Sequence, residues 1–144
     1  MIRVANETDL EGLLKLYTQL KTNPLSGESD KLTELWYEII YDKNHYVIVA
    51  DKDGEIVSTC VLIIIPNLTH NQRSYALIEN VITNENHRNK GFASACLNYA
   101  KEIAIKENCY KIMLMTGSKS ENTLKFYEHA GYNRNDKTAF IQWL

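Results

Sequence analysis

The chain has 144 residues, of which 44% are hydrophobic and 24% charged, with a formal net charge of −2. This length suits one domain with one core, so we expect a single domain over residues 1–144. The charge gives no basic excess for a nucleic-acid backbone, and the longest apolar run, 60–66, is too short to span a bilayer. We therefore expect neither nucleic acid nor a membrane as a partner.

The three cysteines, Cys60, Cys96 and Cys109, are widely spaced in apolar segments and form no CxxC pair. This pattern predicts reduced thiols in a cytoplasmic protein and no disulfide or zinc framework. The histidines also lack the spacing of metal ligands, so we expect no metal. The first residues, MIRVANETDL, have an acidic flank and no long apolar stretch, which does not fit a signal peptide.

The N-terminal part reads as a short strand over 2–5 followed by two helices. Thr8 to Glu11 fits a capping box, and apolar residues at helical spacing predict a helix over 8–20. Proline and glycine break the pattern at 22–29. A second helix is predicted over 30–41, with these residues on one face: Leu32, Leu35, Trp36, Ile39 and Ile40.

The middle of the chain reads as three strands. A β-branched run over 45–50 leads to Asp53-Gly54, a strong hairpin signal, and a long strand returns over 55–65. A polar loop over 67–74 precedes a third strand over 75–83.

The C-terminal part alternates helices and strands. Apolar residues recur at spacings of three and four from Phe92 to Ile103, which predicts a helix, and a strand follows over 110–116. A second capping box, 118–121, opens a helix that should stop at Ala130-Gly131. The sequence TAFIQWL, 138–144, predicts a closing strand.

The order of these elements predicts an α/β fold. A strand, helix, strand unit from Ile78 to Thr116 implies a parallel pair, because a connection of that length makes a right-handed crossover. The hairpin before it implies antiparallel neighbours. We expect a mixed, mostly antiparallel sheet with one parallel pair and helices on both faces.

The loop NENHRNKGFA, 84–93, passes from a strand straight into a helix. The first amides of a helix have no internal partners, and the helix dipole adds partial positive charge there. Gly91 allows close approach of a ligand to the backbone, and Arg88 and Lys90 add positive charge at the rim. These features fit either a phosphate site or an ordinary capped loop. Neither a Walker loop nor a GxGxxG fingerprint is present.

The segment from Ile78 to Ala104 resembles the acetyl-CoA-binding motif of the GCN5-related N-acetyltransferases (GNAT). Arg88, Gly91 and Ala93 match its Arg/Gln-x-x-Gly-x-Gly/Ala signature. Downstream, Phe126-Tyr127 and Gly131-Tyr132 match the family's Phe-Tyr-x-x-x-Gly-Phe/Tyr stretch. The element order also agrees, so the resemblance covers nearly the whole chain and implies the acyl-CoA N-acyltransferase fold.

The resemblance implies acetyl-CoA as co-substrate. The loop amides would hold its pyrophosphate, and the end of the preceding strand would pair with its pantetheine arm. Ser120 stands where the family often has an asparagine, and it is either a cofactor contact or a helix cap. The implied cofactor-binding residues are Val81, Ile82, Thr83, Arg88, Asn89, Lys90, Gly91, Phe92, Ala93 and Ser120.

Two residues are implied to be catalytic. Tyr127 matches the family's tyrosine that protonates the departing thiolate, although a tyrosine here can also be a packing residue. Glu79 aligns with a position that carries a general base in some members, and it can equally be an outward-facing strand residue. Strand amides near Ile82 would hold the oxyanion. We interpret His87 as a solvated loop residue and reject Cys96 as a nucleophile.

These residues predict direct acetyl transfer to a primary amine. The stretches CYKIMLM and KFYEHAGY are most similar to relatives that acetylate small amines, including aminosugar phosphates. A protein lysine or N-terminal acceptor and a non-catalytic acyl-CoA sensor are the alternatives, and a homodimer stays open. We expect the acceptor pocket to include Tyr17, Trp36, Tyr37, His70 and Arg73.

Overall fold

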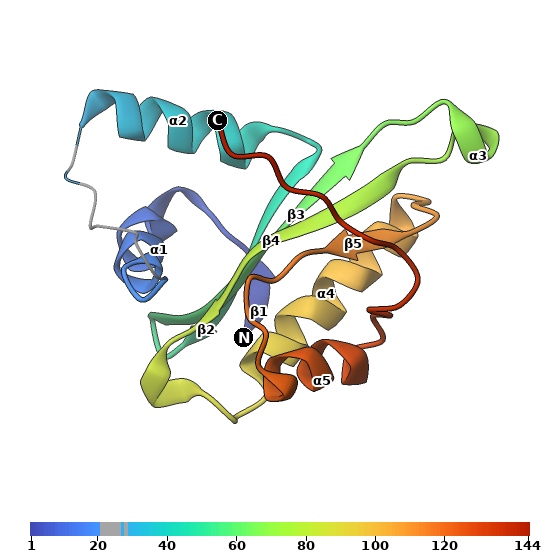
Figure 1. The fold of residues 1–144 in the computed structure, drawn as a ribbon. Helices are drawn as coiled ribbons and strands as arrows, with labels where there is room; N and C mark the ends of the chain where they lie inside the picture. Colours follow the sequence, from blue (N-terminus) through green and yellow to red (C-terminus); the bar gives the residue numbers. More distant parts are fainter. Residues whose placement is uncertain (21–26, 28) are drawn as a thin grey trace.

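A five-stranded sheet in the order β1-β2-β3-β4-β5 forms the centre of the computed structural model, which describes residues 1–20, 27 and 29–144 (Figure 1). The β4–β5 pair is parallel and the other three pairs are antiparallel, as the sequence predicts. The strands are β1 Ile2–Val4, β2 His45–Lys52, β3 Glu55–Ile65, β4 Tyr75–Thr83 and β5 Ile112–Leu114.

Helices cover both faces of this sheet. Helix α4 (Phe92–Lys106) and α5 (Glu121–His129) pack on one face, where Ile48, Leu62, Ile78 and Leu97 are among the buried residues. Helices α1 (Leu10–Tyr17) and α2 (Asp30–Tyr41) pack on the other. The predicted α/β fold with helices on both faces is therefore confirmed. The described residues also contain three short helical turns: η1 Glu7–Asp9, α3 Thr69–Gln72 and η2 Glu85–His87.

The β2–β3 hairpin turns at the predicted dipeptide. Asp53 has φ 54° and Gly54 has φ 86°, the left-handed pair that a type I′ turn requires. Because the twist of this turn matches the twist of the strands, it sets the register that pairs Lys52 with Glu55.

The start of the first helix differs from the prediction. The capping box lies two residues earlier, where the Asn6 side chain accepts from the Thr8 amide and the Asp9 carboxylate accepts from the Asn6 amide. Regular helix then runs only over Leu10–Tyr17. The Asp9 carboxylate is held in this capping position because it also accepts two hydrogen bonds from the Arg3 guanidinium, at 2.6 and 2.9 Å. A tertiary ion pair therefore fixes the start of the helix.

The second helix has the predicted bounds, but one residue that was predicted to lie on its buried apolar face does not lie there. Trp36 is buried, and Ile39 and Ile40 pack against the same cluster, but Leu35 lies half exposed. The predicted break at 22–29 lies, except for Gly27 and Ser29, outside the described residues.

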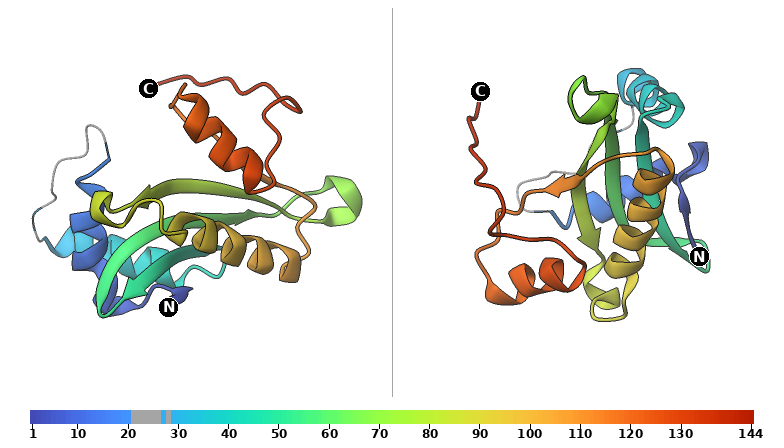
Figure 2. Two further views of the ribbon diagram at one scale, coloured as in Figure 1. Left: turned by 90° about the horizontal axis from the view of Figure 1, so that it is seen from below. Right: turned by 90° about the vertical axis from the view of Figure 1, so that its right-hand side faces the viewer.

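The C-terminal part contains two further differences. The second capping box is absent, because Ser120 precedes α5 without a side-chain cap while the Ser118 hydroxyl accepts from the Ser120 amide. Gly131, with φ 98°, follows the end of α5 as predicted. The predicted strand over 138–144 is wrong, because this segment is extended but pairs with no described strand (Figure 2).

Candidate active site

A cleft of about 760 Å³ lies where β4, the start of α4 and the start of α5 meet. It brings together nine of the twelve residues that the sequence singles out as site residues. These nine are Val81, Ile82, Thr83, Arg88, Asn89, Gly91, Phe92, Ala93 and Tyr127.

The start of α4 forms one end of this cleft. Gly91 is its N-cap, with φ 82°, and no side chain caps the helix. The first helical hydrogen bond runs from the Ala95 amide to the Gly91 carbonyl, at 2.9 Å. Within the described residues, the amides of Phe92, Ala93 and Ser94 therefore have no backbone partner, as expected at a helix start. A negatively charged group can accept from them and is favoured by the helix dipole.

A β-bulge separates the two halves of β4. Val61 pairs with Glu79 and Thr59 pairs with Ile82, so two residues, Asn80 and Val81, stand opposite Cys60. Asn80 has φ 52°, which bends the strand. The bulge coincides with the end of β4–β5 pairing, whose last pair joins Ile78 to Leu114. Beyond it, the two parallel strands separate.

The second half of β4 exposes backbone groups on the side away from β3. The Asn84 amide donates to the Val57 carbonyl on β3, at 2.9 Å. Because backbone groups alternate along a strand, the polar groups of Thr83 and Val81 point to the opposite side, toward the gap. The sequence predicts oxyanion donors near Ile82. The alternation favours the backbone amides of its neighbours, Val81 and Thr83, as these donors.

Tyr127 lies on α5 and lines the cleft. Its ring packs at 5.0 Å from Phe126 and at 6.4 Å from Tyr132, measured between ring centroids. Burial raises the pKa of the Tyr127 phenol above its usual value of 10. The hydroxyl is therefore protonated at neutral pH, and it makes no hydrogen bond to any described residue. It can donate a proton to a group in the cleft.

Glu79 lies immediately before the bulge and does not line the cleft. Ile78 packs toward α4, so strand alternation turns Glu79 toward the face that α1 and α2 cover. Tyr17 on α1 approaches the same bulge: burial raises the pKa of its phenol, and side-chain hydrogen bonds with Thr59 and Asn80 offset part of that rise. Glu79 and Tyr127 therefore approach the gap from opposite faces of the sheet.

Two other predicted residues are also outside the cleft lining. The Lys90 ammonium donates to the Asn86 carbonyl, at 2.9 Å, and Ser120 is exposed at the start of α5. Asn122, the second residue of α5, lines the cleft, although it lies two residues after the position at which the family often has an asparagine. Its position could not be read from the motif, because it depends on how α5 docks.

His87 is not the solvated residue that the sequence suggested. Its side chain is mostly buried, lies against Phe92 and lines the cleft. Its Nε2 is 3.8 Å from a Glu55 carboxylate oxygen, and its Nδ1 is buried with no hydrogen-bond partner among the described residues. The signal that could have found it is its place one residue before Arg88 in the loop.

The cysteines do not supply a nucleophile. All three are free thiols, and burial raises the pKa of Cys96 to about 11 and that of Cys60 further. A thiol with such a pKa stays protonated at neutral pH, so it is a poor nucleophile. The rejection of Cys96 therefore agrees with its environment. Among the described residues, no three His, Cys, Asp or Glu side chains gather as metal ligands do.

The predicted acceptor wall is wrong for three of its five residues. Trp36 is 6% exposed and donates its indole N–H to a backbone carbonyl of η1, so it belongs to the core. His70 and Arg73 lie before the start of β4, whereas the cleft lies at its end. The nine residues of β4 extend about 26 Å at about 3.3 Å per residue, so this length separates the two residues from the cleft. Arg73 instead donates to the carbonyls of Asn108 and Cys109. Tyr17 lies beside the bulge, and Tyr37 is exposed on α2.

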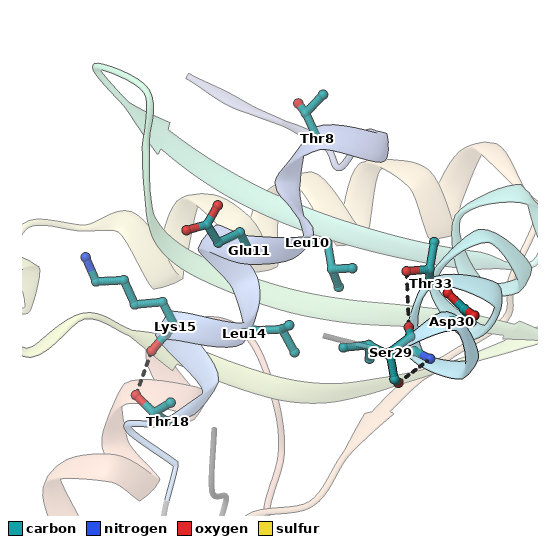
Figure 3. Close-up of a pocket in the computed structure, with 10 residues that line it drawn as sticks. Thr8, Leu10, Glu11, Leu14, Lys15, Thr18, Ser29, Asp30 and Thr33 are labelled. Carbon is teal, nitrogen blue, oxygen red and sulfur yellow. Dashed lines mark hydrogen bonds between the residues drawn. The ribbon is translucent and has the colours of Figure 1, made fainter. Parts of the chain in front are cut away.

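A second groove, of about 850 Å³, lies between α1 and α2 and contains none of the predicted site residues (Figure 3). Leu10, Leu14 and Leu32 are its apolar lining, and Glu11 and Lys15 are at its rim. At its far side Ser29 caps α2 by accepting from the Leu32 amide.

Comparisons with known proteins agree with this arrangement. The acetyltransferase (GNAT) family model matches residues 10–132. A glucosamine 6-phosphate N-acetyltransferase from Trypanosoma brucei brucei is 31% identical over 139 residues, covering 94% of this chain and 90% of that protein. A structure described as an acetyltransferase from Agrobacterium tumefaciens is 34% identical, with a TM-score of 0.91 and 99% of both chains covered.

A more distant structure shows the same fold. The glucosamine-6-phosphate N-acetyltransferase of Arabidopsis thaliana superposes with a TM-score of 0.86 at 22% identity, over 99% of this chain and 97% of that one. None of the described helices is long and apolar enough to cross a membrane. The match over residues 10–132, together with the first two relatives, shows that the chain belongs to the GNAT family and is an N-acetyltransferase.

Proposed function

We propose that this N-acetyltransferase takes its acetyl group from acetyl-CoA, held in the cleft between β4, α4 and α5. One observation carries the proposal: the uncapped start of α4 and the half of β4 that does not pair with β5 open onto the same cleft as Tyr127. A pyrophosphate suits the free amides, and a peptide-like pantetheine arm suits an open strand edge.

The proposed contacts follow from this arrangement. Thr83 and Val81 offer backbone groups to the pantetheine arm, and Gly91 leaves room for the pyrophosphate. Arg88 is available at the rim, where its Nε donates to the Thr83 carbonyl at 3.4 Å. Ser120, the residue before α5, stays a proposed cofactor contact, and we propose Asn122 as the side chain nearer the ligand. The other cofactor contacts are Ile82, Asn89, Lys90, Phe92 and Ala93.

The proposed chemistry is a direct transfer in which the protein supplies an acid, a base and a polarised backbone. Acetyl-CoA provides the acetyl group as a thioester. Glu79, directly or through water, takes the proton that the attacking amine must lose. The Val81 or Thr83 amide stabilises negative charge on the acetyl oxygen. Tyr127 donates its proton to the sulfur as the carbon–sulfur bond breaks. This set of residues needs no metal.

We propose a small primary amine as the acceptor, with an aminosugar phosphate as the first candidate. The support is the 31% identical relative, which is a glucosamine 6-phosphate N-acetyltransferase. The acceptor would reach the gap from the α1 side, past Tyr17 and Asn80. We propose further that the whole chain works as one domain and as a homodimer, in the cytoplasm, where its free cysteines would stay reduced.

Two measurements test these proposals separately. Acetyl-CoA at about 100 times its dissociation constant should stabilise the folded protein by about 2.7 kcal/mol, and an unchanged thermal midpoint would contradict the cofactor site. Turnover should then be compared for glucosamine 6-phosphate, glucosamine and a lysine-containing peptide. A preference for the peptide would replace the small-amine proposal, and binding without turnover of any amine would favour a sensor.

A further inference from the structure

A buried hydroxyl group lies beside the end of β4. Ser58 on β3 is 0% exposed and stands opposite Thr83 in the register of the two strands. Its Oγ lies 3.0 Å from the Ile82 carbonyl oxygen and 2.8 Å from the Thr83 Oγ1. Because a polar group is costly to bury without hydrogen bonds, these two contacts account for a hydroxyl at this place. They tie β3 to the part of β4 that lines the cleft.

The direction of both hydrogen bonds follows from the chemistry of the groups. A serine hydroxyl has one proton and the Ile82 carbonyl can only accept, so Ser58 donates to Ile82. The Thr83 hydroxyl therefore donates its own proton to the Ser58 oxygen. With that proton engaged, the Thr83 oxygen can only accept a hydrogen bond from a ligand in the cleft.

The hydrogen bond to Ile82 also fixes the direction of the Thr83 amide. In a trans peptide unit the carbonyl and the N–H point in opposite directions. Ser58 holds the Ile82 carbonyl on the β3 side, so the Thr83 N–H points toward the gap. The Thr83 carbonyl already accepts from the Arg88 Nε, at 3.4 Å. Thr83 therefore offers a ligand one donor, its amide, and one acceptor, its hydroxyl oxygen.

This pair of groups matches a ligand amide better than a phosphate. An amide carries one N–H donor and one carbonyl acceptor, whereas an ionised phosphate carries only acceptor oxygens, which the Thr83 oxygen would repel. A phosphate instead suits the start of α4, where the amides of Phe92, Ala93 and Ser94 are donors. The two ends of the cleft therefore suit different parts of one cofactor, the amides of a pantetheine arm and a pyrophosphate.

We propose that Ser58 is a positioning residue that prepares Thr83 to bind an amide of the pantetheine arm. Ser58 acts through Thr83, because it is buried and does not itself line the cleft. This inference rests on the proposed acetyl-CoA site. It adds to that site a residue on β3 that assigns Thr83 its donor and its acceptor.

The first test compares two ligands by titration calorimetry: acetyl-CoA, and ADP, which has a pyrophosphate group but no pantetheine arm. In Ser58→Ala the dissociation constant of acetyl-CoA should rise about five- to ten-fold, the effect of one lost hydrogen bond, and that of ADP should stay within about two-fold. Thr59→Val is the matched control, because Thr59 is also 0% exposed and its hydroxyl donates to the Ile48 carbonyl, at 2.7 Å. The control should keep its affinity for both ligands.

The outcomes separate this inference from the cofactor site. A wild type that binds neither ligand contradicts the acetyl-CoA site and this inference with it. A wild type that binds acetyl-CoA, with Ser58→Ala either unchanged or weakened alike for both ligands, overturns the role of Ser58 alone.

The second test is a double-mutant cycle, which shows whether Ser58 acts through Thr83. Thr83→Val replaces the hydroxyl with a methyl group, so it should weaken acetyl-CoA binding by a similar factor, and Ser58→Ala should then add no more than about two-fold. Losses that multiply would show two independent effects and overturn the proposal. Ser58→Cys fills the same space with a weakly hydrogen-bonding group, so it should repeat the loss of Ser58→Ala without a cavity. Thermal midpoints identify the variants that are folded.

Discussion

Removing the Tyr127 hydroxyl tests the proposed chemistry most directly. In Tyr127→Phe the ring keeps its packing at 5.0 Å from Phe126, and the lost hydroxyl makes no hydrogen bond to any described residue. We therefore expect the thermal midpoint to change little, because no buried polar partner is left unsatisfied. General acid catalysis is typically worth about 10²–10⁴-fold, so kcat should fall by about that factor, or about 2.7–5.4 kcal/mol in activation free energy.

The assay measures kcat and the dissociation constant of acetyl-CoA on the same preparation. Tyr132→Phe is the matched control, because burial raises the pKa of Tyr132 to about 12 and its side chain does not line the cleft. This control should keep its turnover within about two-fold, and the acetyl-CoA affinity of Tyr127→Phe should change only a few-fold, since one hydrogen bond nets about 1 kcal/mol. Full turnover in Tyr127→Phe, or an equal loss in the control, would return Tyr127 to a packing role.

Three further predictions test the loop, the base and an ion pair. Gly91→Ala should cost about 1 kcal/mol of unfolding free energy, because φ is 82° there, and it should weaken acetyl-CoA binding about 10-fold or more. Gly54→Ala is the control, because φ is 86° there. In calorimetry it should show the same loss of stability, but its acetyl-CoA affinity should not change. Glu79→Gln should lower kcat/KM most at low pH, where the amine is protonated, and a uniform small effect across a pH profile would argue against a base. Asp9→Asn should cost about 2 kcal/mol of unfolding free energy at pH 7, because it breaks the pair with Arg3. Burial alone would raise the pKa of Asp9, but the Arg3 hydrogen bonds hold it below its usual value. The stabilisation from this carboxylate is therefore full above about pH 4 and is lost as the pH falls further. Acid unfolding curves of wild type and variant should converge at low pH.

The sequence by itself determined the elements that have a strong local signal. The apolar period gave the second helix its bounds, and Asp53-Gly54 marked the hairpin because only residues tolerant of positive φ make that turn. The long connection from β4 to β5 predicted their parallel pairing. The Arg88-to-Ala93 loop could be located because free amides and Gly91 are local properties of a helix start.

Tertiary structure decided the features that depend on a neighbour. The bulge at Asn80 and the separation of β4 from β5 follow from strand register, which no single segment contains. The docking of α5 placed Asn122 rather than Ser120 in the cleft. His70 and Arg73 looked like parts of a pocket wall, but the length of β4 separates them from it.

The C-terminal segment shows the same distinction most clearly. Its composition predicts a strand, because β-branched and aromatic residues favour extended backbone. A strand also needs a partner for its amides and carbonyls, and residues 138–144 have none in the described part of one chain. Composition therefore set the conformational preference of this segment, whereas only the arrangement of the sheet decides what it pairs with, because inter-strand hydrogen bonds belong to two strands at once.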